Sequence, residues 1–126
     1  MNRFLLICLG GALGSGARYL VSLWALRWLG SSFPWGTFIV NVLGCFLLSV
    51  VVHAPALNRI LTPTVQLALT VGVMGGFTTY SSFNYEATEY FREALPVRGW
   101  LYLGATIVAC LGAGLLGLAA ARTFLR

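Results

Sequence analysis

Lysine and aspartate are absent from this sequence of 126 residues, and charged residues make up only 9% of it. Arginine supplies all eight basic residues and glutamate all three acidic ones. A water-soluble globule of this size needs far more polar surface, so the scarcity of charge excludes a soluble domain. The single histidine, His53, and the three cysteines are dispersed without the spacing of a metal site or a catalytic centre, which argues against an enzyme.

Hydrophobic residues, by contrast, make up 59% of the chain. A helix crosses a hydrocarbon layer of about 30 Å with about 20 mostly apolar residues, so the length accommodates four crossings. The apolar segments predict helices over approximately 4–29, 36–57, 65–92 and 99–121, forming a single transmembrane domain over 1–126. The start of the first segment resembles a signal peptide, but its apolar run continues past Ala17, so we expect it to remain a membrane helix.

The arginines divide almost evenly between the two sides of a four-helix topology. One side carries Arg3, Arg59, Arg122 and Arg126, and the other carries Arg27, Arg92 and Arg98. Because Lys and Arg in short loops set the orientation of a membrane protein, this balance predicts insertion in both orientations. We expect two oppositely oriented copies to pair into an antiparallel homodimer; the alternative is a fixed topology set by other features. The positions of the charges do not indicate a nucleic-acid partner.

Small residues recur four apart at Gly10 and Gly14, Ala105 and Ala109, and Ala113 and Gly117. Such pairs let helix backbones approach closely inside a membrane. The spacing alone fits packing within one chain as well as packing between two.

The third apolar segment contains two glycines, Gly75 and Gly76, followed by a run of Thr, Tyr, Ser and Asn residues. Glycine weakens a helix, and non-helical backbone at this depth occurs only inside protein or beside a wet cavity. The sequence therefore predicts a break near 75–79 that faces the interior of the assembly. Its carbonyl oxygens would suit a hard cation and its hydroxyls an anion, so the sign of the ion stays open. The hydroxyls could also bond back onto their own helix.

Further polar and aromatic side chains fall near this break. Phe77, Tyr80 and Phe83 recur at a spacing of three, and ring edges can face an anion, although such a stripe also fits core packing. Asn41 lies in the second apolar segment, where an amide must find a partner or line a wet path. In the fourth segment, one helix face carries Tyr102, Thr106 and Cys110. These side chains form either a track of weak hydrogen-bond donors or a set of groups that bond to neighbouring helices.

Three motifs in this order resemble the CrcB/Fluc family of fluoride channels, and together they cover nearly the whole chain. They are Gly10-Gly11-Ala12-Leu13-Gly14 with Arg18-Tyr19, Pro34-Trp35-Gly36-Thr37 with Asn41-Val42-Leu43-Gly44, and Gly75-Gly76-Phe77-Thr78-Thr79-Tyr80-Ser81-Ser82-Phe83. The resemblance implies a multi-pass protein of the prokaryotic inner membrane that exports fluoride passively and relieves its toxicity. It also implies an antiparallel dual-topology homodimer with a structural Na⁺ at its centre.

Carried over by motif, the backbone carbonyls of Gly75 and Thr78 would bind Na⁺. The fluoride pore would be lined by Asn41, Phe77, Thr79, Tyr80, Ser81, Phe83, Tyr102, Thr106 and Cys110. Arg18 and Glu86 would have a vestibule or structural role. The chain departs from the family pattern twice, because Tyr80 stands where phenylalanine is usual and Cys110 stands where relatives carry a serine hydroxyl.

The alternative is a small dual-topology exporter that couples a drug or cation to protons. Such a protein needs a carboxylate deep in the membrane, whereas Glu86, Glu89 and Glu93 cluster toward one end of the third segment. A purely structural membrane subunit would not need the hydroxyl-rich break.

Overall fold

A computed structural model describes residues 2–125, and the regular structure within this range is entirely helical. Arg126, which entered the count of charges above, lies outside the described residues. The elements in chain order are α1 (Arg3–Leu29), α2 (Trp35–His53), α3 (Pro55–Ile60), α4 (Pro63–Leu67), a π-helix η1 (Ala68–Met74), α5 (Gly75–Phe77), α6 (Tyr80–Arg92) and α7 (Pro96–Phe124).

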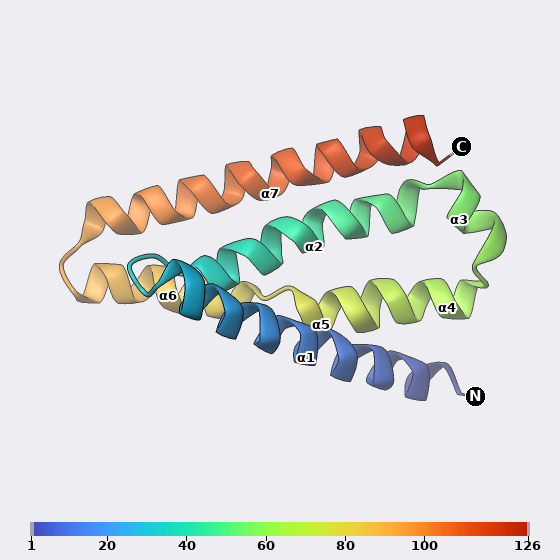
Figure 1. The fold of residues 1–126 in the computed structure, drawn as a ribbon, viewed down its shortest axis with the longest axis horizontal. Helices are drawn as coiled ribbons and strands as arrows, with labels where there is room; N and C mark the ends of the chain where they lie inside the picture. The colour runs from blue at the N-terminus through green and yellow to red at the C-terminus, as the bar shows by residue number, and fades with distance from the viewer. Residues whose placement is uncertain (1, 126) are drawn as a thin grey trace.

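Three of the described helices, α1, α2 and α7, are long and apolar enough to cross a membrane. Figure 1 shows that the segment from α4 to α6 runs along the same long axis, antiparallel to α2 and α7, and that both termini lie at one end. Large apolar side chains point away from the helix bundle, as Leu13 (70% exposed) and Val108 (71% exposed) do. A surface of this kind suits lipid rather than water.

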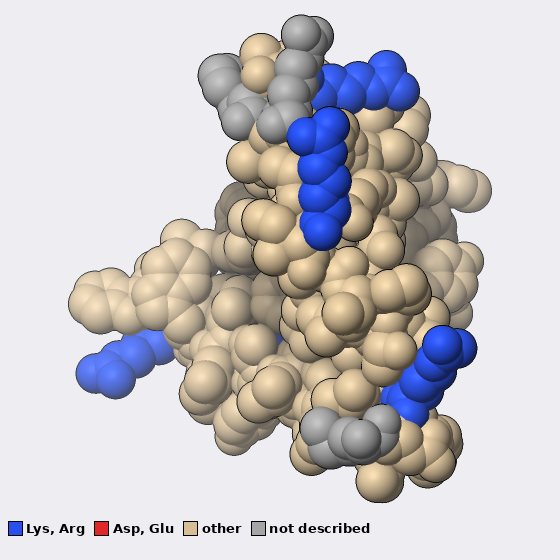
Figure 2. All heavy atoms as spheres, turned by 90° about the vertical axis from the view of Figure 1, so that its right-hand side faces the viewer, with Lys and Arg blue, Asp and Glu red and all other residues tan. Residues whose placement is uncertain are grey.

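The bundle end that holds both termini carries positive charge. Figure 2 views this end, and the charged side chains visible on it are arginines. The glutamates belong to α6 and to the turn that follows it, near the opposite end of the bundle in Figure 1. The two ends of the bundle therefore differ in charge.

Proline fixes two helix boundaries that differ from the expected ones. The second helix was expected to reach residue 57, but α2 ends at His53 because Pro55 disfavours helical backbone at the residue before it. Ala54 is accordingly extended, and α3 begins as a separate helix. The fourth helix begins at Pro96 rather than at residue 99, since proline is well suited to the first turn of a helix.

The break in the third segment lies at Thr78 and Thr79, both of which have extended backbone. This position is within the predicted range, but the two glycines, Gly75 and Gly76, are helical and belong to α5. The segment enters the break through the π-helix η1, a wide form that is rare and often found near functional sites.

The glycines instead permit a backbone-to-backbone contact between α1 and the helical run 68–77. A Cβ added to Gly10 would lie 2.7 Å from the Ala68 carbonyl oxygen, and one added to Gly72 would lie 2.8 Å from the Ile7 carbonyl oxygen. Gly14 and Gly76 are tighter still, against the Val73 and Gly11 carbonyl oxygens. The pair Gly10 and Gly14 thus packs within the chain.

Gly117 on α7 makes the same kind of contact with α2, where an added Cβ would meet the Phe46 carbonyl oxygen. Ala105, by contrast, is exposed.

Candidate ion pathway

One side chain holds the break together. The Asn41 amide of α2 donates through Nδ2 to the Thr79 carbonyl oxygen at 3.0 Å, and its Oδ1 accepts from the Thr79 N–H at 2.8 Å. A peptide outside a helix needs such partners at membrane depth. Asn41 is only 9% exposed, so this clamp is a buried replacement for the helical bonds that the break removes.

The clamp also changes the bonding of the carbonyls before the break. In a continuous helix the Thr79 N–H would bond the Gly75 carbonyl, and the Ser82 N–H would bond the Thr78 carbonyl. Here the Thr79 N–H bonds Asn41, and the Ser82 N–H bonds the Thr79 hydroxyl at 3.2 Å. The carbonyls of Gly75 and Thr78 are therefore without their usual helical donors.

A cavity of about 320 Å³ opens beside the break, between α2, α6 and α7. We call it the central cavity. Its lining includes six of the sequence-predicted pore residues, namely Asn41, Thr79, Tyr80, Phe83, Thr106 and Cys110, together with Thr78. Four further lining residues were not predicted: Gly44, Cys45, Leu48 and Ile107. Three of these follow Asn41 at helical spacing on α2, a signal that would have found them.

Thr106 gives the central cavity an unpaired polar group. Its side chain is 3% exposed, and among the described residues its hydroxyl is the buried side-chain oxygen that has no hydrogen-bond partner. Leaving a buried hydroxyl unpaired costs about 1–3 kcal/mol. Thr106 is one of the residues that line the cavity, so a bound ion or water that reached this hydroxyl would recover that cost.

Two aromatic rings form the wall of the central cavity on α6. Tyr80 and Phe83 meet edge to face, with ring centroids 6.0 Å apart, and Phe83 is buried while Tyr80 is 77% exposed. Phe77 does not join them, because the break interrupts the helical register on which the three-residue spacing depends. It packs instead beside Gly14 of α1 and Gly44 of α2.

The remaining predicted pore residues lie elsewhere. Ser81 is exposed, and its hydroxyl lies 3.3 Å from that of Thr79. Tyr102 is 1% exposed and donates its hydroxyl to Glu86 Oε2 at 2.6 Å. It shares a helix face with Thr106 and Cys110, but it does not line the central cavity.

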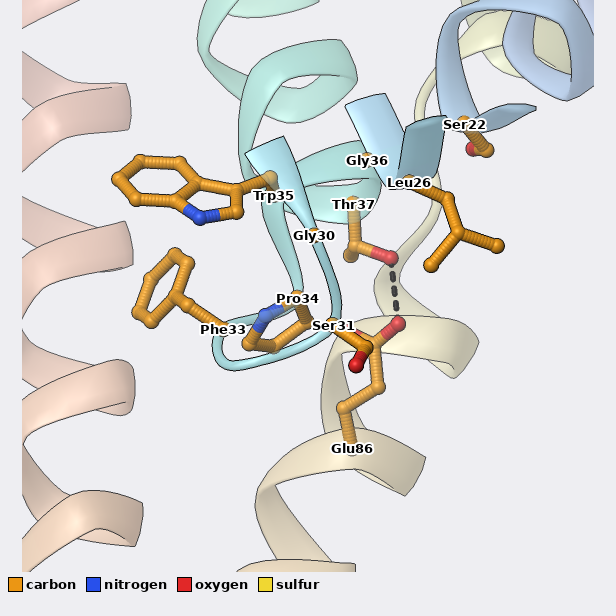
Figure 3. A pocket seen from close by; sticks show the side chains of 10 residues that line it. All are labelled: Ser22, Leu26, Gly30, Ser31, Phe33, Pro34, Trp35, Gly36, Thr37 and Glu86. Atoms are coloured by element: carbon orange, nitrogen blue, oxygen red, sulfur yellow. Dashed lines mark hydrogen bonds between the residues drawn. The ribbon is translucent and has the colours of Figure 1, made fainter. Parts of the chain in front are cut away.

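Glu86 ties three helices together near the end of the bundle. Its carboxylate accepts from Thr37 on α2 as well as from Tyr102 on α7, in both cases at 2.6 Å. It thus has a structural role on α6, and the carboxylate also lines a second cavity of about 270 Å³ between α1, α2 and α6. Figure 3 shows Glu86 reaching up to Thr37 across this cavity. Thr37, one turn before Asn41, was not predicted.

Arg18 is half-buried on α1, one turn before Ser22. Ser22 and Leu26 are the α1 residues that line the cavity beside Glu86, and Arg18 is not among its lining residues.

The arrangement offers an ion several weak donors and no full charge. The central cavity is lined by threonine, asparagine and aromatic residues, and its lining contains no arginine and no glutamate. The described residues contain no group of three or more His, Cys, Asp or Glu side chains that could hold a metal ion. A site of this composition suits a small anion that must enter and leave without being trapped.

Comparisons with known proteins also indicate a pathway for a small anion. Residues 5–118 match the family model described as CrcB-like protein, Camphor Resistance (CrcB). The chain is 54% identical over 111 residues to a protein of Anaeromyxobacter sp. (strain K) named fluoride-specific ion channel FluC, covering 88% of each chain. It is 46% identical over 122 residues to a protein of the same name from Sorangium cellulosum, covering 97% of this chain and 96% of that one.

Proposed function

Because this chain belongs to the CrcB family, we propose that it is a fluoride channel of the prokaryotic inner membrane that lets fluoride leave the cytoplasm passively and so relieves its toxicity. Its similar relatives carry the name of fluoride-specific ion channels. The observation that carries the proposal within this chain is the buried, unpaired hydroxyl of Thr106, a residue that lines a cavity beside a broken helix.

Fluoride is small and strongly hydrated, so a pore must replace its water with several donors, each weak enough to release it. The Thr106 hydroxyl is one donor without a competing partner. The Asn41 amide has a second N–H beyond the one given to Thr79, since an amide nitrogen carries two. The positive edges of Tyr80 and Phe83 add contacts that do not hold the ion with a full charge.

We also propose that the broken segment from α4 to α6 is the fourth crossing. It runs along the bundle axis from one end to the other in Figure 1, and both termini lie at one end, as an even number of crossings requires. It lacks the continuous apolar helix of the other three spans because its second half carries hydroxyl, amide and carboxylate groups.

The exposed face of α6 supports an antiparallel homodimer. It carries polar side chains at helical spacing, namely Tyr80, Ser81, Asn84, Tyr85 and Thr88. Polar groups at this depth do not face lipid, so a second copy would cover them. The nearly even division of arginines between the two sides supports opposite orientations of the two copies. Reporter fusions at the C terminus should then be active on both sides of the membrane, and activity on one side alone would contradict this.

We also propose that a structural Na⁺ binds at the break, between the two copies. The Gly75 and Thr78 carbonyls are without their helical donors, and Gly75 is exposed with open space around it. Carbonyl oxygens are ligands that hard cations prefer. Two carbonyls from each copy would form a four-oxygen site between the copies, where Na⁺ would neutralise the carbonyl dipoles and hold the two breaks together.

The direct test is passive flux. Purified protein in liposomes loaded with fluoride should release fluoride, measured with an ion-selective electrode, without an imposed proton gradient. Matched liposomes loaded with chloride should retain it. Chloride release without fluoride release would overturn the assignment, and flux that requires a proton gradient would favour the exporter.

A further inference from the structure

Two cysteines from different helices lie where two cavities meet. Cys45 of α2 and Cys110 of α7 both line the central cavity. They also line a cavity of about 510 Å³ that continues between the same helices toward the end of α2, which we call the terminal cavity. The residues common to both linings are these two cysteines and Leu48. The two cavities therefore lie on either side of these three side chains.

The two thiols are free and belong to one local environment. Neither cysteine is in a disulfide, both are half-buried, and the Cys110 thiol interacts with the Cys45 side chain. Cys8, the third cysteine, is exposed on α1 and lines neither cavity. The chain thus contains one thiol pair and one isolated thiol, which can serve as an internal control.

The surroundings restrict which metal ion the pair could bind. Zinc takes four ligands in structural sites and at least three protein ligands in catalytic ones, and no group of three such side chains exists among the described residues. His53, the other metal-binding side chain in the terminal cavity, lies two turns beyond Cys45 and directs its Nδ1 at the Ser49 carbonyl oxygen, 2.9 Å away. Two sulfur ligands without a third suit soft cations that prefer linear two-coordination.

We propose that Cys45 and Cys110 form a two-thiolate site for a soft, two-coordinate metal ion, of which Hg²⁺ is the probe. One Hg²⁺ binds both thiols, two S–H bonds break, two Hg–S bonds form and two protons are released to solvent. The product is a neutral dithiolate, which avoids placing a charge inside the membrane. Part of the inference rests on the proposed function: an ion held between the two cysteines occupies part of the central cavity and blocks fluoride.

The binding of Hg²⁺ can be tested without measuring fluoride flux. In the Cys8→Ala chain, one Hg²⁺ per chain should protect both remaining thiols from alkylation by N-ethylmaleimide, as counted by mass spectrometry. The Cys45→Ala/Cys110→Ala chain, which keeps only Cys8, is the matched control. Against an excess of a monothiol competitor, the pair should retain Hg²⁺ at least about 100-fold better than Cys8 alone, because the second sulfur binds intramolecularly. Equal retention, or alkylation of one thiol of the pair, overturns the site.

Block is tested separately in liposomes that contain fluoride. Hg²⁺ should stop fluoride efflux through the Cys8→Ala chain, and the fraction blocked should fall in Cys45→Ala and in Cys110→Ala, each compared with its own flux before Hg²⁺. If Hg²⁺ binds the pair and flux continues, the site exists but does not lie on the pathway. If the untreated chain carries no fluoride, the proposed function fails while the binding result stands.

Discussion

The two halves of the bundle are built in opposite ways. Where α1 meets the run 68–77, glycines on both sides bring backbone against backbone and leave no space for a single added carbon. Beside the break, where α2 and α7 meet α6, the contacts are made by hydroxyls, an amide, a carboxylate and aromatic rings, and cavities remain between them. One half holds the broken segment in place, and the other keeps space open for an ion.

The largest effect on stability should come from adding volume where α1 packs against the run 68–77. Gly14→Val places a branched side chain against the Val73 carbonyl and the Phe77 N–H, where even a Cβ has no room. We expect the free energy of unfolding in detergent to fall by more than about 3 kcal/mol, the upper range for overpacking a core. The matched control is Gly16→Val on the same helix, where nothing lies within 4 Å of an added Cβ. An equal loss in both variants would show that helix propensity, rather than close packing, determines the effect.

Removing the hydrogen bonds between Asn41 and Thr79 should have a smaller effect on stability. Asn41→Leu keeps the volume but leaves both the N–H and the carbonyl of Thr79 without their present partner. We expect a loss of about 2 kcal/mol in unfolding free energy, the lower end of what two buried unpaired groups cost at about 1–3 kcal/mol each. Hydrogen exchange at the Thr79 amide should rise as well. Unchanged protection of that amide would mean that the break has another partner.

A substitution beside the central cavity should have the smallest effect on stability and a selective effect on fluoride transport. Thr106→Val replaces an unpaired hydroxyl with a methyl group, so stability should stay level or rise. Fluoride efflux should fall about tenfold, the equivalent of one hydrogen bond in the transport barrier. Thr70→Val is the control, because its hydroxyl bonds the Gln66 carbonyl and the residue does not line the central cavity. Full flux through Thr106→Val would remove that hydroxyl from the pathway.

Local composition was enough to predict the apolar spans and the existence of a break, because both depend on residues that are adjacent in sequence. It also placed Thr106 and Cys110 on one face of a helix, since α7 is continuous. The break itself lies after the glycines rather than at them. Gly76 is used for contact with Gly11 on α1, and a composition-based argument cannot distinguish a glycine that loosens a helix from one that lets a neighbour approach.

The partners of the break could not be predicted in the same way. Asn41 and Thr79 are 38 positions apart, so their pairing depends on how α2 packs against the broken segment. Phe77 was misplaced for a related reason: a spacing of three indicates a shared face only within an unbroken helix, and the extended residues Thr78 and Thr79 rotate it away from Tyr80 and Phe83.

The long-range clamp has a consequence for how the chain is made. Asn41 is synthesised before Thr79. Its side-chain amide is therefore already in the membrane when the backbone of Thr79 enters and needs hydrogen-bond partners. In a fragment that begins after α2, the Thr79 peptide would enter the lipid without its hydrogen-bond partner. The order of the helices along the chain therefore provides a hydrogen-bond partner for the Thr79 peptide as soon as it enters the membrane.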